Sequence, residues 1–183
     1  MSGLQTERGK QETVLLEKKI ESYLATLYRI AFLQLKNAED AEDVVQEVFY
    51  QYMKANRIFE NQEHEKAWLI KVTLNSCKKL WRSAWYRHHA PMPDMESACE
   101  LHEQEKVQPE NTYIRREESK ELMKAVWELP DKYREVIHLF YYEGLSVKEI
   151  SSVCGRQEST VTAQLTRGRK VLKKKLKEEY QFE

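Results

Sequence analysis

The residues of this chain whose types and spacing suggest chemistry are lysines and arginines, and the chemistry is the non-covalent binding of phosphates and bases. Lys71, Asn75, Lys78 and Arg82 recur at intervals of four, three and four residues, so a helix would carry them on one face. The surrounding segment, 66–89, holds six basic residues and no acidic one. A cationic helix stripe of this kind indicates a nucleic-acid partner.

Aromatic residues lie close to this stripe along the chain. They are Phe59, Trp68, Trp81, Trp85 and Tyr86. Aromatic rings stack on unpaired bases, so we count Phe59 among the candidate DNA contacts. Trp68 and Trp81 have a simpler interpretation as core residues, because apolar side chains recur around them at helical spacing.

A second cationic helix is predicted at 157–178, where residues 159–177 hold seven basic residues and no acidic one. Its buried stripe is expected at 161, 165, 168 and 172. Short side chains near the start of the opposite face suit an approach to base edges in the major groove, and cations further along suit phosphates. The candidate DNA contacts on this face are Thr162, Ala163, Thr166, Arg167, Lys170 and Lys174.

The residues before this helix complete a helix-turn-helix pattern. A short helix is predicted at 146–153, and Gly155 can adopt the positive φ that ends a helix. A surface helix with a solvated basic face is the alternative interpretation. We favour the helix-turn-helix because the turn glycine and both apolar stripes agree with the basic row.

One predicted helix, 38–55, has the opposite charge. Asp43, Glu47 and Tyr50 share a face of it, with Gln46 beside them. Acids near a helix start also interact favourably with the helix dipole, so ordinary capping is one explanation. A protein-binding surface is the more specific one, and these four residues are its candidates.

Helices must carry these faces, and apolar residues recur at helical spacing through most of the chain. Helices are predicted at about 14–36, 38–55, 66–86, 112–128, 131–142, 146–153 and 157–178. Asn37, three residues before Asp40, is the expected N-cap of the second. Residues 91–111 hold three of the four prolines and a surplus of acids, which indicates a flexible acidic linker. We therefore predict an all-α protein with an N-terminal tail at 1–12 and two small helical domains at 13–90 and 112–180.

The net charge is less informative than its distribution. Among 183 residues, 30 lysines and arginines balance 30 acids, so the formal net charge is zero. Residues 39–47 hold five acids and no base, and 94–110 hold six acids and one lysine. Screening limits the reach of a charge block to about 10 Å, so the blocks act separately and a zero sum does not exclude DNA.

Several functional classes find no support. The mean hydropathy of −0.75 and the absence of a long apolar run argue against membrane insertion, and the polar N-terminus lacks the apolar stretch of a secretory signal. Cys77, Cys99 and Cys154 have no paired spacing, which indicates reduced thiols in the cytoplasm. Motifs of hydrolases, phosphate-binding loops and zinc sites are absent. We expect no enzyme activity, no metal and no cofactor.

Three motifs, in order, resemble those of bacterial sigma factors. Residues 40–49, DAEDVVQEVF, are similar to region 2.2, and the run from 67 to 80 resembles regions 2.3–2.4 of the extracytoplasmic-function (ECF) group. The residues that resemble region 4 are 129–130, 133–136, 142–146, 149–150, 155, 160–161 and 167–169. The resemblance covers about 14–86 and 112–178, which become sigma regions 2 and 4.

This resemblance implies a promoter-specificity subunit of core RNA polymerase in the bacterial cytoplasm. Asp43, Gln46 and Glu47 match the surface that docks on a coiled coil of the largest polymerase subunits. The loop at 56–66 and Asn75 match the pocket that captures a flipped base of the −10 element and so helps to melt the promoter. The positions that match those reading the −35 element are Thr162, Ala163, Thr166 and Arg167. An anti-sigma factor, often membrane-bound in this family, is the further implied partner.

The chain departs from the family pattern at four positions. Gln157 stands where the family often has a Ser or Thr N-cap, and Gly168 replaces the commoner Ala. Thr162 and Ala163 offer few hydrogen bonds, so base readout would depend on Arg167 and on DNA shape.

A helix-turn-helix regulator that acts without polymerase is the alternative function, since the C-terminal half alone would permit it. The acidic helix beside a cationic helix argues against that class. A protein-only adaptor would leave both cationic helices unexplained.

Overall fold

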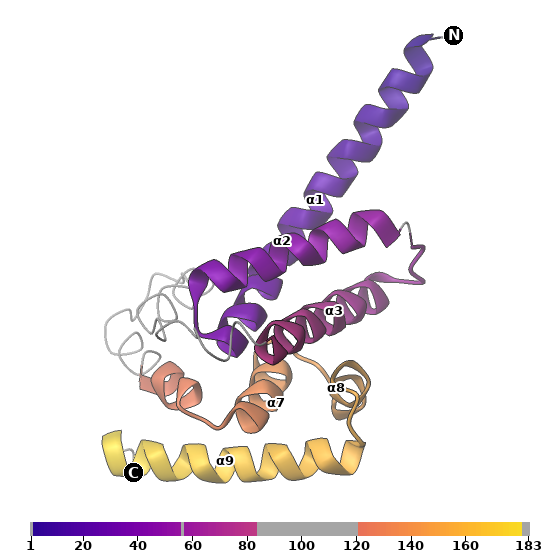
Figure 1. Ribbon diagram of the computed structural model, residues 1–183. Coiled ribbons are helices and arrows are strands. Elements are labelled where there is room, and N and C mark those ends of the chain that lie inside the picture. The colour runs from indigo at the N-terminus through magenta and orange to yellow at the C-terminus, as the bar shows by residue number, and fades with distance from the viewer. Residues whose placement is uncertain (1, 56, 84–120, 181–183) are drawn as a thin grey trace, which may run out of the picture.

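The computed structural model describes residues 2–55, 57–83 and 121–180, with side chains from residue 14 to residue 178 inside these ranges (Figure 1). The described residues form helices and their connections, without any strand, so the prediction of an all-α fold is confirmed. No helix in the described part is long and apolar enough to cross a membrane. The predicted linker at 91–111 lies outside the described residues.

Three helices form an N-terminal bundle, α1 (Ser2–Leu35), α2 (Ala38–Ala55) and α3 (Gln62–Arg82). Its core holds fully buried aliphatic side chains from each helix, among them Leu27, Val48 and Leu69. The backbone N–H of Asp40 donates to Asn37 Oδ1 at 2.9 Å, as expected for the N-cap of α2. Figure 1 shows the N-terminal part of α1 extending well beyond the other helices.

Two predicted helix starts in this bundle were wrong. Helix α1 begins at Ser2 rather than near residue 14, so the predicted tail at 1–12 is helical from Ser2 onward. Helix α3 begins at Gln62 rather than at 66, because the Asn61 side chain accepts a hydrogen bond from the His64 N–H and caps the first turn. It ends at Arg82, and residues 84–86 lie outside the described part.

A C-terminal bundle follows, made of a short helical segment at 121–127, α7 (Asp131–Tyr141), α8 (Val147–Cys154) and α9 (Glu158–Tyr180). Ser146 and Glu149 form a capping box at the start of α8, and Gly155 ends it with a φ of 65°. Gly168 lies where α9 meets α7, since a Cβ there would be 3.1 Å from Ile137 Cγ1. The capped short helix, the glycine turn and α9 form the predicted helix-turn-helix.

The two bundles are packed against each other, which the sequence did not lead us to expect. Helix α3 contacts α8, and α1 contacts α7. The rings of Phe32 and Trp127 lie 5.4 Å apart, and the Arg134 guanidinium donates a hydrogen bond to the Leu33 carbonyl at 2.9 Å. A single buried apolar cluster therefore runs through both bundles.

Candidate nucleic-acid and protein interfaces

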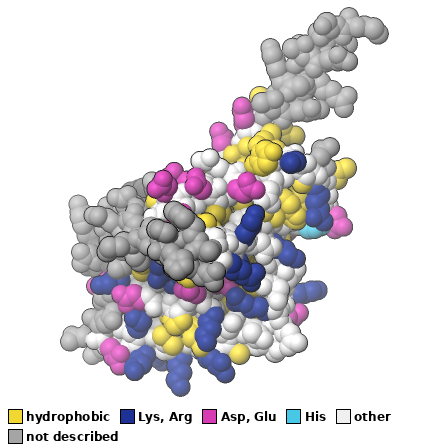
Figure 2. Space-filling view, in the orientation of Figure 1, with side chains coloured by type: hydrophobic (Ala, Val, Ile, Leu, Met, Phe, Trp, Pro, Cys, Tyr) yellow, Lys and Arg dark blue, Asp and Glu magenta, His cyan; other side chains and the backbone are white. Residues whose placement is uncertain are grey.

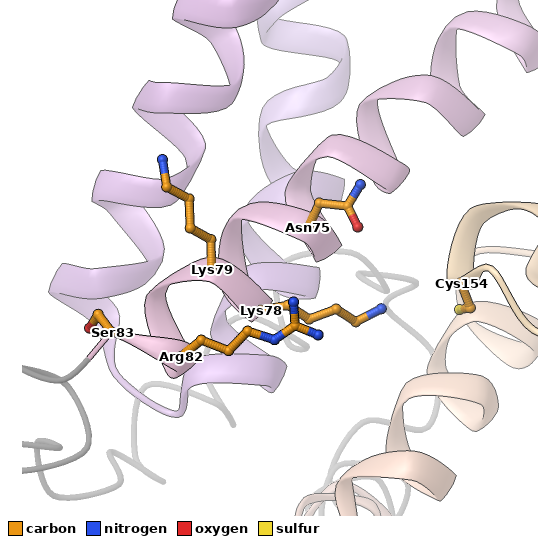
Figure 3. A pocket seen from close by; sticks show the side chains of 6 residues that line it. All are labelled: Asn75, Lys78, Lys79, Arg82, Ser83 and Cys154. Carbon is orange, nitrogen blue, oxygen red and sulfur yellow. The ribbon is translucent and has the colours of Figure 1, made fainter.

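The cationic stripe of α3 is largely exposed, and its C-terminal part faces α8. Lys71, Asn75 and Arg82 are exposed, and the Lys78 side chain is 36% exposed. Asn75, Lys78 and Arg82 also line an open pocket of about 670 Å³, with Lys79, Ser83 and Cys154. In Figure 3, Lys78 and Arg82 project toward the side where Cys154 of α8 lies, and Lys79 points away from them.

Phe59 belongs to an aromatic cluster at the loop between α2 and α3. Its half-buried ring lies 6.1 Å from the ring of Tyr52, 5.6 Å from that of Trp68 and 5.9 Å from that of His64. The Arg57 guanidinium lies 5.8 Å from the same ring. A ring, a cation and an exposed loop thus meet at one end of α3.

Trp68 is partly buried against the core, as expected, but the prediction for Trp81 was wrong. The Trp81 side chain, in the last turn of α3, is 43% exposed. Trp85 and Tyr86 lie outside the described residues.

A buried carboxylate holds this end of the N-terminal bundle together. Glu65 is 3% exposed, and it accepts hydrogen bonds from Lys19 Nζ at 2.7 Å, Tyr52 Oη at 2.5 Å and Tyr23 Oη at 3.2 Å. Burial acts to raise the pKa of Glu65, but the hydrogen bonds from Lys19 and Tyr52 outweigh it and lower this pKa below its usual value. Burial and the neighbouring Glu65 raise the pKa of Tyr23 to about 12. The network joins all three helices beside the loop that carries Phe59.

The outer face of α2 carries the predicted protein-binding residues. Asp43, Gln46, Glu47 and Tyr50 are all exposed, while Ala41, Val44, Val45, Val48 and Phe49 on the opposite side are buried. Tyr50 is 54% exposed, and Met53, one turn further, is also exposed. An exposed aromatic ring and a thioether beside acidic residues are typical of a surface that binds another protein.

The outer face of α9 carries the second set of candidate DNA contacts. Thr162, Ala163, Thr166, Arg167, Lys170 and Lys174 are all exposed, while Val161, Leu165 and Gly168 are buried. The hydroxyl groups of Thr162 and Thr166 donate to the carbonyls of Glu158 and Thr162, each at 2.9 Å. Figure 2 shows numerous Lys and Arg side chains at the bottom of the view, over α9, and a group of acidic side chains in the upper part, over α2.

Sequence reasoning missed the charged groups buried between the bundles. Arg134, Glu135, His138 and Glu143 are each at most 7% exposed. Arg134 also donates to the carbonyls of Trp127 and Leu129 and to Asp131. The sequence does carry one sign of these buried charges, because charged positions in 131–143 interrupt the apolar face of the predicted helix.

Comparison with known proteins matches both halves of the chain to one protein family. The family model "Sigma-70 region 2" matches residues 20–87, and "Sigma-70, region 4" matches residues 119–172. The ECF RNA polymerase sigma factor SigW of Bacillus subtilis is 27% identical over 179 residues, which cover 95% of this chain and 94% of SigW. RNA polymerase sigma factor SigV of the same organism is 28% identical, over 94% of this chain and 98% of SigV.

Solved structures share the fold. The sigma factor RpoE, in complex with the anti-sigma factor NepR from Bartonella quintana, matches with a TM-score of 0.60 at 20% identity, over 89% of this chain and 97% of RpoE. CnrH in complex with the cytosolic domain of CnrY matches with a TM-score of 0.60 at 21% identity, over 90% of this chain and 88% of the CnrH chain.

Proposed function

The chain belongs to the sigma-70 family and to its ECF group, and we propose that each of its three charged faces, on α2, α3 and α9, binds a different target of an RNA polymerase sigma factor. A sigma factor of this group binds core RNA polymerase, directs it to promoters and helps to melt the −10 region. The observation that supports this assignment is the charge of each face, which is acidic on α2 and cationic on α3 and α9, with the candidate residues of α2 and α9 all exposed and those of α3 exposed or partly exposed.

The face of α2 binds core polymerase. Asp43 and Glu47 supply negative charge, Gln46 supplies a hydrogen-bonding amide, and Tyr50 adds a half-exposed ring at the end of the row. Complementary charge steers the encounter and fixes the register of the complex, while the ring adds buried area.

The face of α3 binds −10 DNA. Lys71, Lys78 and Arg82 attract phosphates, and Asn75 offers both a donor and an acceptor to a base edge. Phe59, with the ring cluster behind it, offers a surface on which an unpaired base stacks, and stacking is worth about 1–3 kcal/mol per base. That gain offsets part of the cost of unpairing, so melting needs no catalytic group, and we propose that the factor acts by binding alone.

The face of α9 binds the −35 element in the major groove. Thr162, Ala163 and Thr166 lie near the helix start, where short side chains allow close approach to base edges. Arg167 is the long donor among them, and Lys170 and Lys174 hold phosphates further along. We propose domain limits of 13–90 for core and −10 binding and 112–180 for −35 binding.

The factor works in the bacterial cytoplasm under the control of an anti-sigma factor. This partner is proposed because the two solved structures above are described as complexes with anti-sigma or partner proteins. A regulator that binds DNA without polymerase is not favoured, since region 2 as well as region 4 matches.

Run-off transcription with purified core polymerase tests the function. The template pool is a library of random-sequence fragments, from which transcribed members are selected and resequenced. We expect transcripts only when core and this protein are both present, with two shared sequence elements upstream of the starts. A protein that binds DNA fragments yet yields no transcript with core would contradict the proposal.

A further inference from the structure

The turn before the proposed −35 helix is tied to its neighbours by one side chain, that of Arg156. One terminal nitrogen of its guanidinium donates to a carboxylate oxygen of Glu135 on α7, and the other donates to Gln164 Oε1 on α9 at 3.0 Å. Arg156 itself follows Gly155, which ends α8. Its side chain therefore connects α7, the turn after α8, and α9.

The backbone of Arg156 is held as firmly as its side chain. Its N–H donates to the Ser151 carbonyl at 3.1 Å, and its own carbonyl accepts a hydrogen bond from the Ser151 hydroxyl at 2.5 Å. Gly155, just before it, adopts the left-handed conformation that ends α8. A fixed backbone and two bonded nitrogens leave the guanidinium little freedom, so the position of α9 follows that of α7.

The Glu135 end of this connection is buried. The Glu135 side chain is 4% exposed, and that of Arg156 is 23% exposed. A buried carboxylate needs a compensating cation, and Arg156 supplies it beside Lys78, whose Nζ lies 3.7 Å from the other carboxylate oxygen. Glu135 is therefore a fixed point of attachment for Arg156 rather than a mobile surface acid.

The start of α9 is where such a connection matters most. Gln157 directly precedes this helix, and glutamine is not among the short residues that cap helix starts well. Gln164, which Arg156 holds, lies beside Ala163 and one turn before Arg167, and both of these are candidate DNA contacts. The hydrogen bond from Arg156 is therefore made at the part of the helix that is proposed to enter the groove.

We propose that Arg156 is a positioning residue for −35 recognition, which holds α9 at the angle that brings its short side chains to the base edges, without touching a base itself. The side chains of Thr162, Ala163 and Thr166 are too short to follow a tilt of the helix, whereas a lysine adapts to it. Groups of this kind need to be held within about 0.5 Å of their working positions by supporting hydrogen bonds. The inference rests on the proposed role of α9 in −35 binding.

Binding of the holoenzyme to promoter duplexes tests this role. The full chain is combined with core polymerase, and two duplexes carry the same selected −10 element with either the selected or a scrambled −35 element. Arg156→Lys is the main variant, because lysine keeps the charge that Glu135 requires but lacks the planar fork that bonds two partners at once. We expect its discrimination between the duplexes in fluorescence anisotropy to fall about tenfold, as for the loss of one good base contact. Discrimination equal to that of the native chain would overturn the proposal.

A second variant breaks the same contact from its other end. Gln164→Met keeps the length of the side chain and removes the oxygen to which Arg156 donates. We expect a similar loss of discrimination, and we expect the double variant to lose no more than either single one, because all three lack the same hydrogen bond. Losses that add would assign each residue its own DNA contact and would overturn the proposal. A lower unfolding temperature with unchanged discrimination would indicate a purely structural role and would overturn it as well.

Arg169→Lys is the matched control. Arg169 also connects α9 to α7, since its Nε donates to Tyr141 Oη at 2.8 Å, but it does so further along the helix and at an exposed position. We expect this control to keep the native discrimination, and an equal fall in it would overturn the special role of Arg156. Equal binding of both duplexes by the native holoenzyme would instead refute the proposed −35 role, whereas a native preference that every variant keeps would refute only the role of Arg156.

Discussion

Removing the charge of Glu65 should destabilise the N-terminal bundle in a pH-dependent way. In Glu65→Gln, one oxygen still accepts a hydrogen bond, but the charge that strengthens the bonds from Lys19 and Tyr52 is lost. Hydrogen bonds to a charged group contribute about 1.5–3 kcal/mol each. The Lys19 side chain is 41% exposed, so solvent screening reduces the contribution of the Lys19–Glu65 hydrogen bond to about 1 kcal/mol or less. We expect a loss of about 2 kcal/mol in the free energy of unfolding at pH 7.

The pH dependence follows from the direction of the pKa shift. The pKa of Glu65 is lower in the folded than in the unfolded chain, so the unfolded chain binds its proton first as pH falls. The stabilisation by the charge is complete above the unfolded pKa and disappears as pH falls through the folded pKa. The difference in stability between the native chain and Glu65→Gln should therefore be constant near neutrality and shrink in acid.

Urea denaturation followed by circular dichroism at several pH values measures this difference. Glu63→Gln is the matched control, because Glu63 lies in the same first turn of α3, is exposed, and shares any effect of the helix dipole. The reasoning would be refuted if Glu65→Gln lost no more stability than Glu63→Gln. It would also be refuted if the gap between Glu65→Gln and the native chain stayed the same in acid.

Three further predictions concern the proposed interfaces and the thiols. Asp43→Lys should weaken core binding in a pull-down by about tenfold, because a rim charge is reversed, without a change in helicity. Arg167→Ala should lose about 1–3 kcal/mol of discrimination between a matched and a scrambled −35 duplex, as measured by fluorescence anisotropy. Lys174→Ala should lower the affinity for both duplexes alike. An equal loss of affinity for both duplexes in Arg167→Ala would contradict its role in base readout. Burial raises the pKa of the thiols of Cys77 and Cys154 to about 12, so both should resist iodoacetamide at pH 8 in the folded chain and react once it is unfolded, as read by mass spectrometry.

Most helix limits could be predicted because local signals fix them. Helix α2 has the predicted limits, since Asn37 caps its start and its apolar residues keep one period. Helices α8 and α9 fall within two residues of prediction, because Ser146 and Gly155 mark the limits of α8. The start of α3 was missed because its first turn is polar, and its N-cap, Asn61, precedes the first apolar residue by several positions.

The contact between bundles could not be predicted by the same means. Arg134 and Leu33 are 101 positions apart in the sequence, and no local period relates them. Glu135 and Glu143 look like ordinary solvated acids of an amphipathic helix until the N-terminal bundle covers them. Exposure of the candidate faces of α2 and α9, in contrast, agrees with helical periodicity, because their candidate residues lie opposite the buried apolar stripe.

The two threonine hydroxyls of α9 have a consequence for the kind of sequence that this helix favours. Because each hydroxyl is already bonded to a carbonyl one turn earlier, the outward-facing groups of Thr162 and Thr166 are methyl groups, like the side chain of Ala163. A row of methyl groups complements the 5-methyl group of thymine in the major groove. Replacing thymine by uracil in the −35 duplex leaves every base-pair hydrogen bond intact, yet it should lower the affinity of this helix for its site.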